Sequence, residues 1–427
     1  MIKFIVNGIL RDKNRSVLPI LVVTIGVFLT VALSAWMRGI FGDMTTLNAN
    51  FDSGHVKVMT QAYKANRSQL PNDLALLEAG EWQRRFEAQY PSIEWAPRIN
   101  FSVLVDVPDE QGETRAQGTM LAKAVDLLSP HSHEIERLNL SQALSEGNGS
   151  RLPQQSGELL ISEDFAQGFK VNIGDEITLF GSTMYGSMMF VNYTVCGTIK
   201  FGNAVLDRGG LIIDINDARQ ALDMHDACSE LLGFFKDGEY DDAKALAIQQ
   251  DFNDKFCDAT DEYSPEMIIL TDDSTIGLYL KMADKMSAIM VFVLILILSI
   301  VLWNTGLLGT IRRYSEFGVR LALGEPKWHI YRSLIVEALF VGSIGSVLGT
   351  LLGWWMAYYL QETGVDFSAL MDNVTMMIPS VYKAKITSET FYIGFIPGLF
   401  AVVLGNALAG RAIFKRQTSQ LFNELEV

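Results

Sequence analysis

The sequence predicts an integral membrane protein with four transmembrane α-helices and a large α+β domain inserted between helices 1 and 2. Three observations predict this fold class. Hydrophobic residues make up 49% of the 427 residues and charged residues only 19%, and the mean hydropathy is +0.20. The apolar residues are concentrated in four windows, each long enough to cross a hydrocarbon core of about 30 Å as a helix. The long segment between the first two windows is acidic and shows mixed α and β patterns.

The four windows are taken as transmembrane helices at 17–36, 287–309, 334–360 and 391–414. The first follows Arg11, Lys13 and Arg15, so a cleaved signal peptide is the alternative interpretation. Its apolar run is about 20 residues, longer than the 7–15 of a signal sequence, and this favours an uncleaved anchor.

Charge predicts the orientation of the chain. Residues 37–286 carry 20 Lys/Arg and 39 Asp/Glu, whereas 1–16 and 311–333 each carry three more basic than acidic residues. By the positive-inside rule, both termini and the loop at 310–333 are cytoplasmic, and 37–286 lies outside the cytoplasm. We therefore expect a multi-pass protein of the inner (cytoplasmic) membrane with a periplasmic domain.

The expected organisation follows from these boundaries, in chain order: a cytoplasmic entry helix at 1–16, helix 1 at 17–36, the extracytoplasmic domain with helical stalks at 37–286, helix 2 at 287–309, a cytoplasmic loop at 310–333, helix 3 at 334–360, a short outer loop at 361–390, helix 4 at 391–414 and a cytoplasmic tail at 415–427.

Within the outer domain, alternating apolar residues predict strands at 54–59, 100–107 and 190–197. Amphipathic patterns predict helices at 72–88 and 241–256. The polar stretch at 148–155 marks a division between two subdomains.

Motifs for chemistry are sparse. No G-x-x-x-x-G-K-[ST] loop is present, and the chain also has no H-E-x-x-H, C-x-x-C or G-x-S-x-G motif. We expect no catalytic, cofactor or metal site on this chain, and the net charge of −15 argues against a nucleic-acid partner. His131, His133 and Glu134 have the right chemistry for a metal, but a solvated loop is the favoured interpretation.

Three cysteines, Cys196, Cys228 and Cys257, all fall in the outer domain. In an oxidising compartment one pair would bridge and leave an odd thiol. Cys228–Cys257 is the pair to test, and the sequence does not decide whether it forms.

Two sets of residues are candidates for mechanical roles. Gly345, Gly349 and Gly353 recur every fourth residue in the third span, a spacing that lets a second helix approach closely, within this chain or in a dimer. The cytoplasmic segment 312–332 reads as a short amphipathic helix ending at Gly324, followed by Pro326 at the start of the next helix. Its apolar and charged residues suit a protein groove better than a lipid surface.

At this segment the sequence resembles the permeases of the MacB/FtsX/LolC-LolE class of ABC transporters, the type VII or mechanotransmission class. Their cytoplasmic loop reads approximately R-x-E-[IF]-G-x-x-R-A-[LI]-G-A, and the matching residues here are Glu316, Phe317, Gly318, Arg320, Leu323 and Gly324. Residues 157–179, which contain the pair Gly174-Asp175, and the entry segment 11–16 also resemble the class. Residues 195–222 look closest to the lipoprotein-releasing LolC/LolE branch. The tail departs from the family's P-x-E-A-L ending.

The resemblance implies that Glu316, Phe317, Gly318, Arg320, Leu323 and Gly324 contact an ATPase. It implies a complex with two ABC ATPase subunits, which carry the ATP and Mg, and a second permease, identical or homologous. Membrane lipid and a periplasmic carrier or adaptor are further expected partners.

The function expected on this basis is not enzymatic. The permease moves its outer domain and releases lipoproteins, or another amphipathic substrate, from the outer leaflet of the inner membrane. The alternatives are MacB-like efflux of peptides or antibiotics with a periplasmic adaptor, and FtsX-like signalling to a cell-wall hydrolase.

Overall fold

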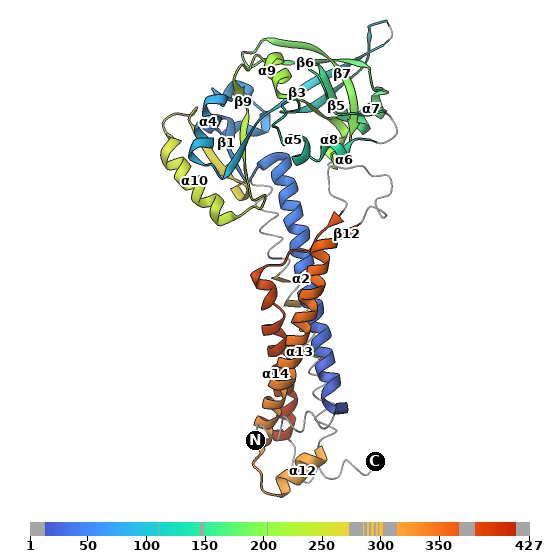
Figure 1. Cartoon of the computed structure of the whole chain (residues 1–427), viewed down its shortest axis with the longest axis vertical. Helices are drawn as coiled ribbons and strands as arrows, with labels where there is room; N and C mark the ends of the chain where they lie inside the picture. The colour runs from blue at the N-terminus through green and yellow to red at the C-terminus, as the bar shows by residue number, and fades with distance from the viewer. Residues whose placement is uncertain are drawn as a thin grey trace. The chain divides into compact units, whose positions relative to one another are not determined.

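A computed structural model of the chain divides it into two compact units, which are described separately (Figure 1). The helical unit comprises Met1–Asp43, Lys281–Asp366 and Val381–Val427, and the sheet unit comprises Met44–Leu280 and Phe367–Ser380. The structure describes residues 13–109, 111–145, 149–202, 204–272, 314–366 and 381–415, with scattered positions between 285 and 301.

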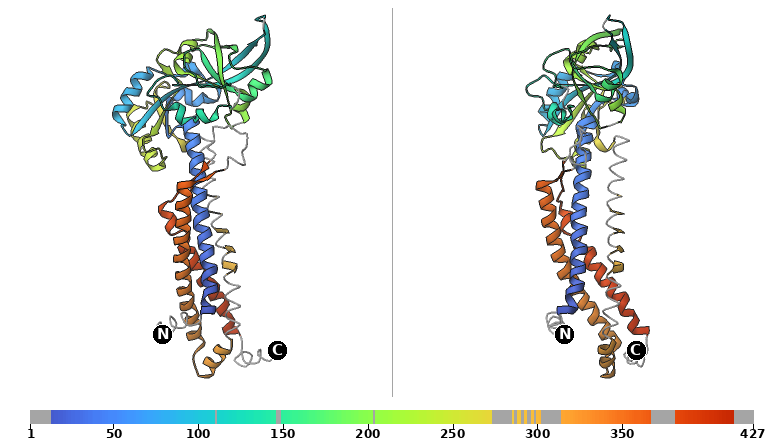
Figure 2. Two further views of the ribbon diagram at one scale, coloured as in Figure 1. Left: turned by 45° about the vertical axis from the view of Figure 1, so that its right-hand side comes forward. Right: turned by 90° about the vertical axis from the view of Figure 1, so that its right-hand side faces the viewer.

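The helical unit is built on long apolar helices. Its elements are α2 (Lys13–Asn48, whose residues from Met44 on belong to the sheet unit), α12 (Tyr314–Ala322), α13 (Lys327–Thr363), β12 (Val365–Asp366), β13 (Val381–Tyr382), η6 (Ser388–Phe391) and α14 (Phe395–Lys415). In both views of Figure 2, α2 (blue) runs alongside α13 (orange).

Two helices of the described residues are long and apolar enough to cross a membrane, Val17–Ser53 and Lys327–Thr363. They contain the first and third expected spans. The fourth corresponds to α14, whose apolar stretch Phe395–Leu408 is shorter than a span. The second, 287–309, lies largely outside the described residues, and the positions described between 285 and 301 are helical. Residues 1–12 of the expected entry helix and the tail from 416 also lie outside.

The sheet unit contains eleven described strands and several short helices. The strands are β1 (Val56–Thr60), β2 (Leu76–Leu77), β3 (Ile93–Pro108), β4 (Thr114–Val125), β5 (Glu158–Ser162), β6 (Glu176–Ser182), β7 (Met188–Ile199), β8 (Gly210–Asp214), β9 (Ala227–Cys228), β10 (Glu230–Phe235) and β11 (Pro265–Ile269). The helices are η1 (Ala49–Ser53), α3 (Gln61–Asn66), η2 (Arg67–Gln69), η3 (Asn72–Leu74), α4 (Ala79–Gln89), α5 (Glu134–Arg137), α6 (Leu140–Ala143), α7 (Glu163–Phe169), α8 (Ala204–Gly209), α9 (Ile215–Ala221), α10 (Asp242–Phe256) and η4 (Leu270–Asp272).

Nine strands form one sheet in the order β11-β1-β10-β3-β4-β8-β5-β7-β6, and β6 also pairs with β3. Six strands therefore close into a barrel, which leaves no free edge among them. The 16-residue β3 joins two parts of the sheet, because Ile93–Arg98 pair with β10 and Ile99–Pro108 pair with β4.

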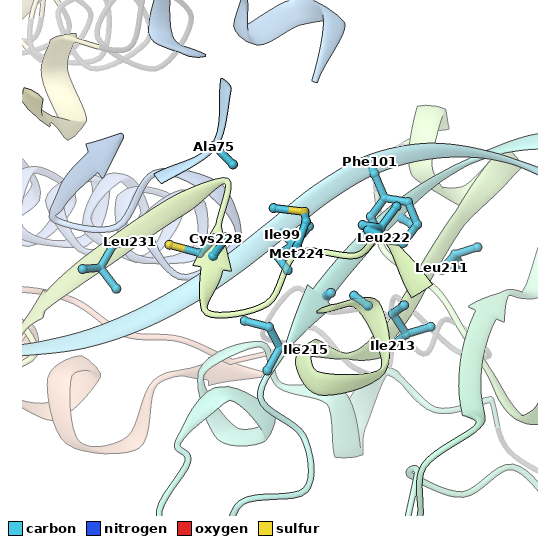
Figure 3. Close-up of a cluster of buried hydrophobic side chains, with 14 of the residues drawn as sticks. Ala75, Ile99, Phe101, Leu211, Ile213, Ile215, Leu222, Met224, Cys228 and Leu231 are labelled. Atoms are coloured by element: carbon cyan, nitrogen blue, oxygen red, sulfur yellow. The ribbon is translucent and has the colours of Figure 1, made fainter. Parts of the chain in front are cut away.

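The strands expected at 54–59, 100–107 and 190–197 correspond to β1, β3 and β7. Residues on both sides of the 148–155 loop share one core: Ile99 and Phe101 lie in the same buried cluster as Leu211 and Ile213 (Figure 3). The expected subdomain division at 148–155 therefore does not divide the core.

The helix expected at 72–88 was wrong in its first half. Asn72–Leu74 forms a single 3-10 turn, and Leu76 and Leu77 pair with Cys228 and Ala227 of β9. The helix α4 begins only at Ala79, where the backbone N–H of Ala79 donates to the carbonyl oxygen of Asp226, at 2.8 Å. These partners lie about 150 residues away in the chain, so a local pattern does not reveal them.

Candidate coupling helix and packing seam

The short helix α12 packs one face against the chain itself. Phe317 is 1% exposed and contacts Ile330 and Leu334 of α13, with Leu321 packed beside them. Phe317 was expected to contact an ATPase, and in the structure its ring packs against α13. The contact ties α12 to the first turns of α13.

The opposite face of α12 is apolar and exposed. Val319 is 51% exposed and Leu323 83%. Glu316 and Arg320 occupy helix positions on the same side, because residues three and four apart share a face. Val319 was not among the expected contact residues, although its i, i+4 spacing to Leu323 was the available signal. Gly318 is buried, so it does not belong to this face.

The end of α12 is set by Gly324. Its φ of 90° is in the left-handed region, the N–H of Gly324 donates to the Leu321 carbonyl (3.0 Å), and the N–H of Glu325 donates to the Arg320 carbonyl (3.0 Å). This pair of bonds is a Schellman motif, which stops a helix at a glycine. Pro326 then stands at the N-cap of α13, as the sequence predicts.

Three glycines of α13 face α2. A Cβ built on Gly345, Gly349 or Gly353 would lie 2.7 Å from a side-chain atom of Val23, Val27 or Val31, respectively. Such close approach lets backbone pack on backbone, which is how helices associate in a bilayer. The seam joins two helices of the same chain.

Two glycines that sequence reasoning missed complete the seam. Gly394 and Gly398 face Val31 and Val27 from the side of α14. The same two valines of α2 therefore pack against α13 on one side and against the start of α14, with the residue before it, on the other. The signal was the four-residue spacing of Gly394 and Gly398, which repeats that of α13.

The segment after β13 makes a further contact with α2, through backbone hydrogen bonds. The N–H of Lys385 donates to the Ala35 carbonyl (3.0 Å), and the N–H of Ala384 donates to the Leu360 carbonyl of α13 (3.3 Å). Gly39 faces the backbone of Lys383. Residues 383–385 therefore link α2 to α13 through backbone hydrogen bonds.

Aromatic side chains gather near both ends of α13. Trp328 and Tyr331 stack near its start, and near its end Trp355, Tyr358 and Tyr359 are exposed. Roughly 35 Å of helix separates the two groups at 1.5 Å per residue. This matches the aromatic belts that flank a hydrocarbon core of about 30 Å.

The residues considered as metal ligands, His133 and Glu134, form hydrogen bonds with other protein side chains. Glu134 receives hydrogen bonds from Arg98 and Arg137, and His133 bonds to Glu94. No group of three potential metal ligands occurs among the residues that the structure describes.

All three cysteines are free thiols, so the Cys228–Cys257 bridge is not formed. Burial raises the pKa of both Cys196 and Cys228 to about 12, which makes these thiols unreactive at neutral pH.

Comparisons with known proteins agree with this architecture. The model of the MacB-like periplasmic core domain matches residues 16–249, more than half of the chain, and the FtsX-like permease C-terminal model matches residues 288–418. The chain belongs to the MacB/FtsX family. The two matched ranges place the α12–α13–α14 region in the FtsX-like part and the nine-stranded sheet mainly in the MacB-like part.

Individual relatives of this MacB/FtsX family chain are distant. An uncharacterized ABC transporter permease protein of Mycobacterium tuberculosis is 25% identical over 260 residues, covering 60% of this chain and 28% of the relative. The macrolide export ATP-binding/permease protein MacB of Acinetobacter baylyi is 29% identical over 101 residues, 24% of this chain and 15% of the relative. The chain thus spans less than a third of the length of these relatives.

Among solved structures, the periplasmic region of MacB from Actinobacillus actinomycetemcomitans is 10% identical to this chain with a TM-score of 0.34, covering 54% of this chain and 94% of that structure. The relatives above are MacB and an uncharacterized permease, and assignment to the LolC/LolE branch stays a prediction.

Proposed function

We propose that the chain is the permease subunit of an ABC transporter that is driven by a separate ATPase chain. The observation that carries this proposal is α12, a short helix with an exposed face of Val319 and Leu323 and its opposite face packed on α13. The family assignment supports it. ATP and Mg are bound by two copies of the partner ATPase.

The coupling works through packing. An ATPase that displaces α12 displaces the start of α13 as well, because Phe317 lies against Ile330 and Leu334. The closely packed glycine seam then makes α2 move with α13, since tightly packed interfaces shift as units rather than deform. Residues 311–333 and both termini are cytoplasmic in this proposal, as their positive charge suggests.

The substrate is proposed to be amphipathic and to be displaced outside the cytoplasm. Release of lipoproteins from the outer leaflet, with a periplasmic carrier, is the first candidate, on the resemblance of residues 195–222. Efflux with a periplasmic adaptor is the second, and the similarity to macrolide export proteins favours it. In both cases a second permease, identical or homologous, completes the membrane complex.

The experiment compares charge changes on α12. Leu323→Lys places a cation on the exposed face, and Glu316→Lys changes the charge seven residues earlier in the same segment. Glu325→Lys makes the same charge change as Glu316→Lys just beyond the helix end. We expect the first two variants to insert normally and to lose the copurifying ATPase activity, with Glu325→Lys close to wild type. The isolated chain should show no ATP hydrolysis above background.

A loop that merely lies on lipid headgroups gives a different result, because added positive charge strengthens headgroup attraction. Full retention of ATPase activity by both Glu316→Lys and Leu323→Lys would contradict the proposed docking face. Robust hydrolysis by the isolated chain, free of contaminating ATPase, would contradict the division of labour between two chains.

A further inference from the structure

The end of α2 is an unusual joint in the sheet unit. After Asn48 the chain makes one π-helical turn, Ala49–Ser53, and then reverses at Gly54, whose φ is 61°. A helix end leaves up to four carbonyl oxygens without partners inside the helix. Because Gly54 follows, the backbone could rotate at this point and change the direction of α2 unless other groups hold the π-helical turn in place.

Arg98 of β3 holds that turn. Its side chain is fully buried, with 0% exposure. Nη1 donates to the carbonyl oxygen of Phe51 and Nη2 to that of Asn50, both at 2.7 Å, while Nε donates to Glu134 at 2.8 Å. All three guanidinium nitrogens are used, and two of them bind backbone. A planar fork of this kind fixes both position and orientation.

Charged side chains from other elements hold the neighbouring residue, Asp52. Arg67 Nη2 donates to Asp52 Oδ2 at 2.6 Å, and Lys123 Nζ lies 3.6 Å from Oδ1. Burial raises the pKa of Asp52, but the charges of Lys57, Lys123 and Arg67 outweigh this effect and lower it below the ordinary value. The carboxylate is therefore ionised and paired.

The phenyl ring of Phe51 is also held. It meets Phe201 edge-on, with centroids 6.2 Å apart, and Lys123 Nζ lies 4.9 Å from its centre. Three consecutive residues of η1, the turn that directly follows α2, are thus bound by β3, β4, η2 and the loop after β7.

Buried ion pairs are weak contributors to stability, because desolvation offsets most of their attraction. In some proteins such pairs instead fix one arrangement among several. Here the fixed arrangement is that of η1, the turn directly after α2, on the sheet that carries Arg98.

We propose that Arg98 is a positioning residue for energy coupling: it locks the end of α2 to the sheet unit, so that movement of α2 turns the sheet unit instead of being lost at Gly54. This inference rests on the proposed permease function and deepens it. Arg98 contacts no substrate in this role, and it acts through the carbonyl groups of Asn50 and Phe51.

The test uses the complete permease–ATPase complex in lipid nanodiscs. Arg98→Lys keeps the charge but cannot bridge two carbonyls and a carboxylate at once. Arg151→Lys is the matched control, since Arg151 is an arginine of the same unit that pairs with Glu158. A second variant inserts two glycines between Asn48 and Ala49, which leaves the contacts of Arg98 in place and interrupts α2 instead.

Two readouts separate anchoring from simple stability. A spin label at Met44, which is 50% exposed, reports the mobility of the end of α2 in a Cys257→Ser background, because Cys196 and Cys228 are buried. Hydrogen exchange of β3 and β4 with and without ATP reports whether the ATPase moves the sheet unit. The ATP hydrolysis rate and the melting temperature are recorded for every variant.

We expect Arg98→Lys to mobilise the label and to reduce the ATP-dependent change in exchange by about fivefold or more, the lower range of couplings between distant sites. ATP hydrolysis should continue and Arg151→Lys should behave as wild type. The glycine insertion should give the same loss of coupling if Arg98→Lys fails to fold.

An unchanged ATP response in a folded Arg98→Lys variant, or in the glycine insertion, overturns the proposal for Arg98 while leaving the permease function intact. Absence of any ATP response in the wild-type complex overturns the proposed function itself, and with it the role of Arg98. The two failures are therefore distinguishable.

Discussion

Substitution of Gly349 by alanine tests the packing seam with the smallest available change. Gly349 lies on α13 at the middle of the three-glycine row that faces α2. An alanine Cβ there would lie 2.7 Å from both the carbonyl oxygen of Thr24 and the Cβ of Val27. Both are rigid parts of α2, so neither can rotate away.

The expected cost follows from these distances. Carbon atoms pack at about 3.5–4.0 Å, so α2 must retreat by roughly 1 Å. Overpacking of this kind costs about 1–3 kcal/mol, and rigid neighbours favour the upper half of that range. The better helix propensity of alanine returns up to about 1 kcal/mol. The net loss of roughly 1–2 kcal/mol corresponds to a 5- to 30-fold shift toward the unfolded state.

Unfolding of the purified chain in SDS measures this loss through tryptophan fluorescence. Trp36, Trp328, Trp354 and Trp355 all lie on α2 or α13. Val347→Ile is the matched control, because it also adds one carbon to α13 but at a position that is 46% exposed. The control should unfold like the wild type.

Equal stability of Gly349→Ala and Val347→Ile would refute the reasoning, since a tight α2–α13 contact at this glycine cannot accept the extra carbon without a shift. The same result would remove the rigid link through which α13 is proposed to move α2.

Two further predictions concern topology and pH. A reporter that is active only outside the cytoplasm should work when fused after residue 148 and fail when fused at Gly324, and the reverse pattern would end the coupling argument. His55 is buried and accepts the N–H of Phe235, and burial lowers its pKa from 6.5 to about 4. Between pH 6.5 and 4, His55 is therefore protonated in the unfolded chain but not in the folded chain. The free energy of unfolding should fall over this range as the pH drops, by on the order of 3 kcal/mol. His55→Asn should flatten this slope in thermal unfolding, whereas a change at His225, which is exposed, should leave it unaltered.

Local features were predictable from the sequence. The turn at Gly324 and the restart at Pro326 depend on backbone angles that these two residues favour by themselves. Three further features can likewise be read from neighbouring residues alone: the length of the apolar windows, the acidic charge of the outer domain and the four-residue spacing of the glycines.

The face of α12 shows where local reasoning stops. The matching motif placed Phe317 and Leu323 in one contact surface, yet Phe317 is buried against α13 and Leu323 is exposed. Both are apolar residues of one short helical segment, and the sequence of that segment alone does not show which of its faces packs against α13. The buried face of α12 is decided by how α12 packs against Ile330 and Leu334 of α13.

Composition and spacing by themselves determined that this chain holds several apolar helices and a large acidic domain, because span length, charge and turn residues act over a few neighbouring positions. Only the tertiary structure decided which helix the glycines of α13 meet, that β2 shortens an apparent helix, and that Arg98 binds the last turn of α2. Each of those contacts joins residues tens to hundreds of positions apart, and its energy depends on close packing and desolvation that exist only once the chain has folded.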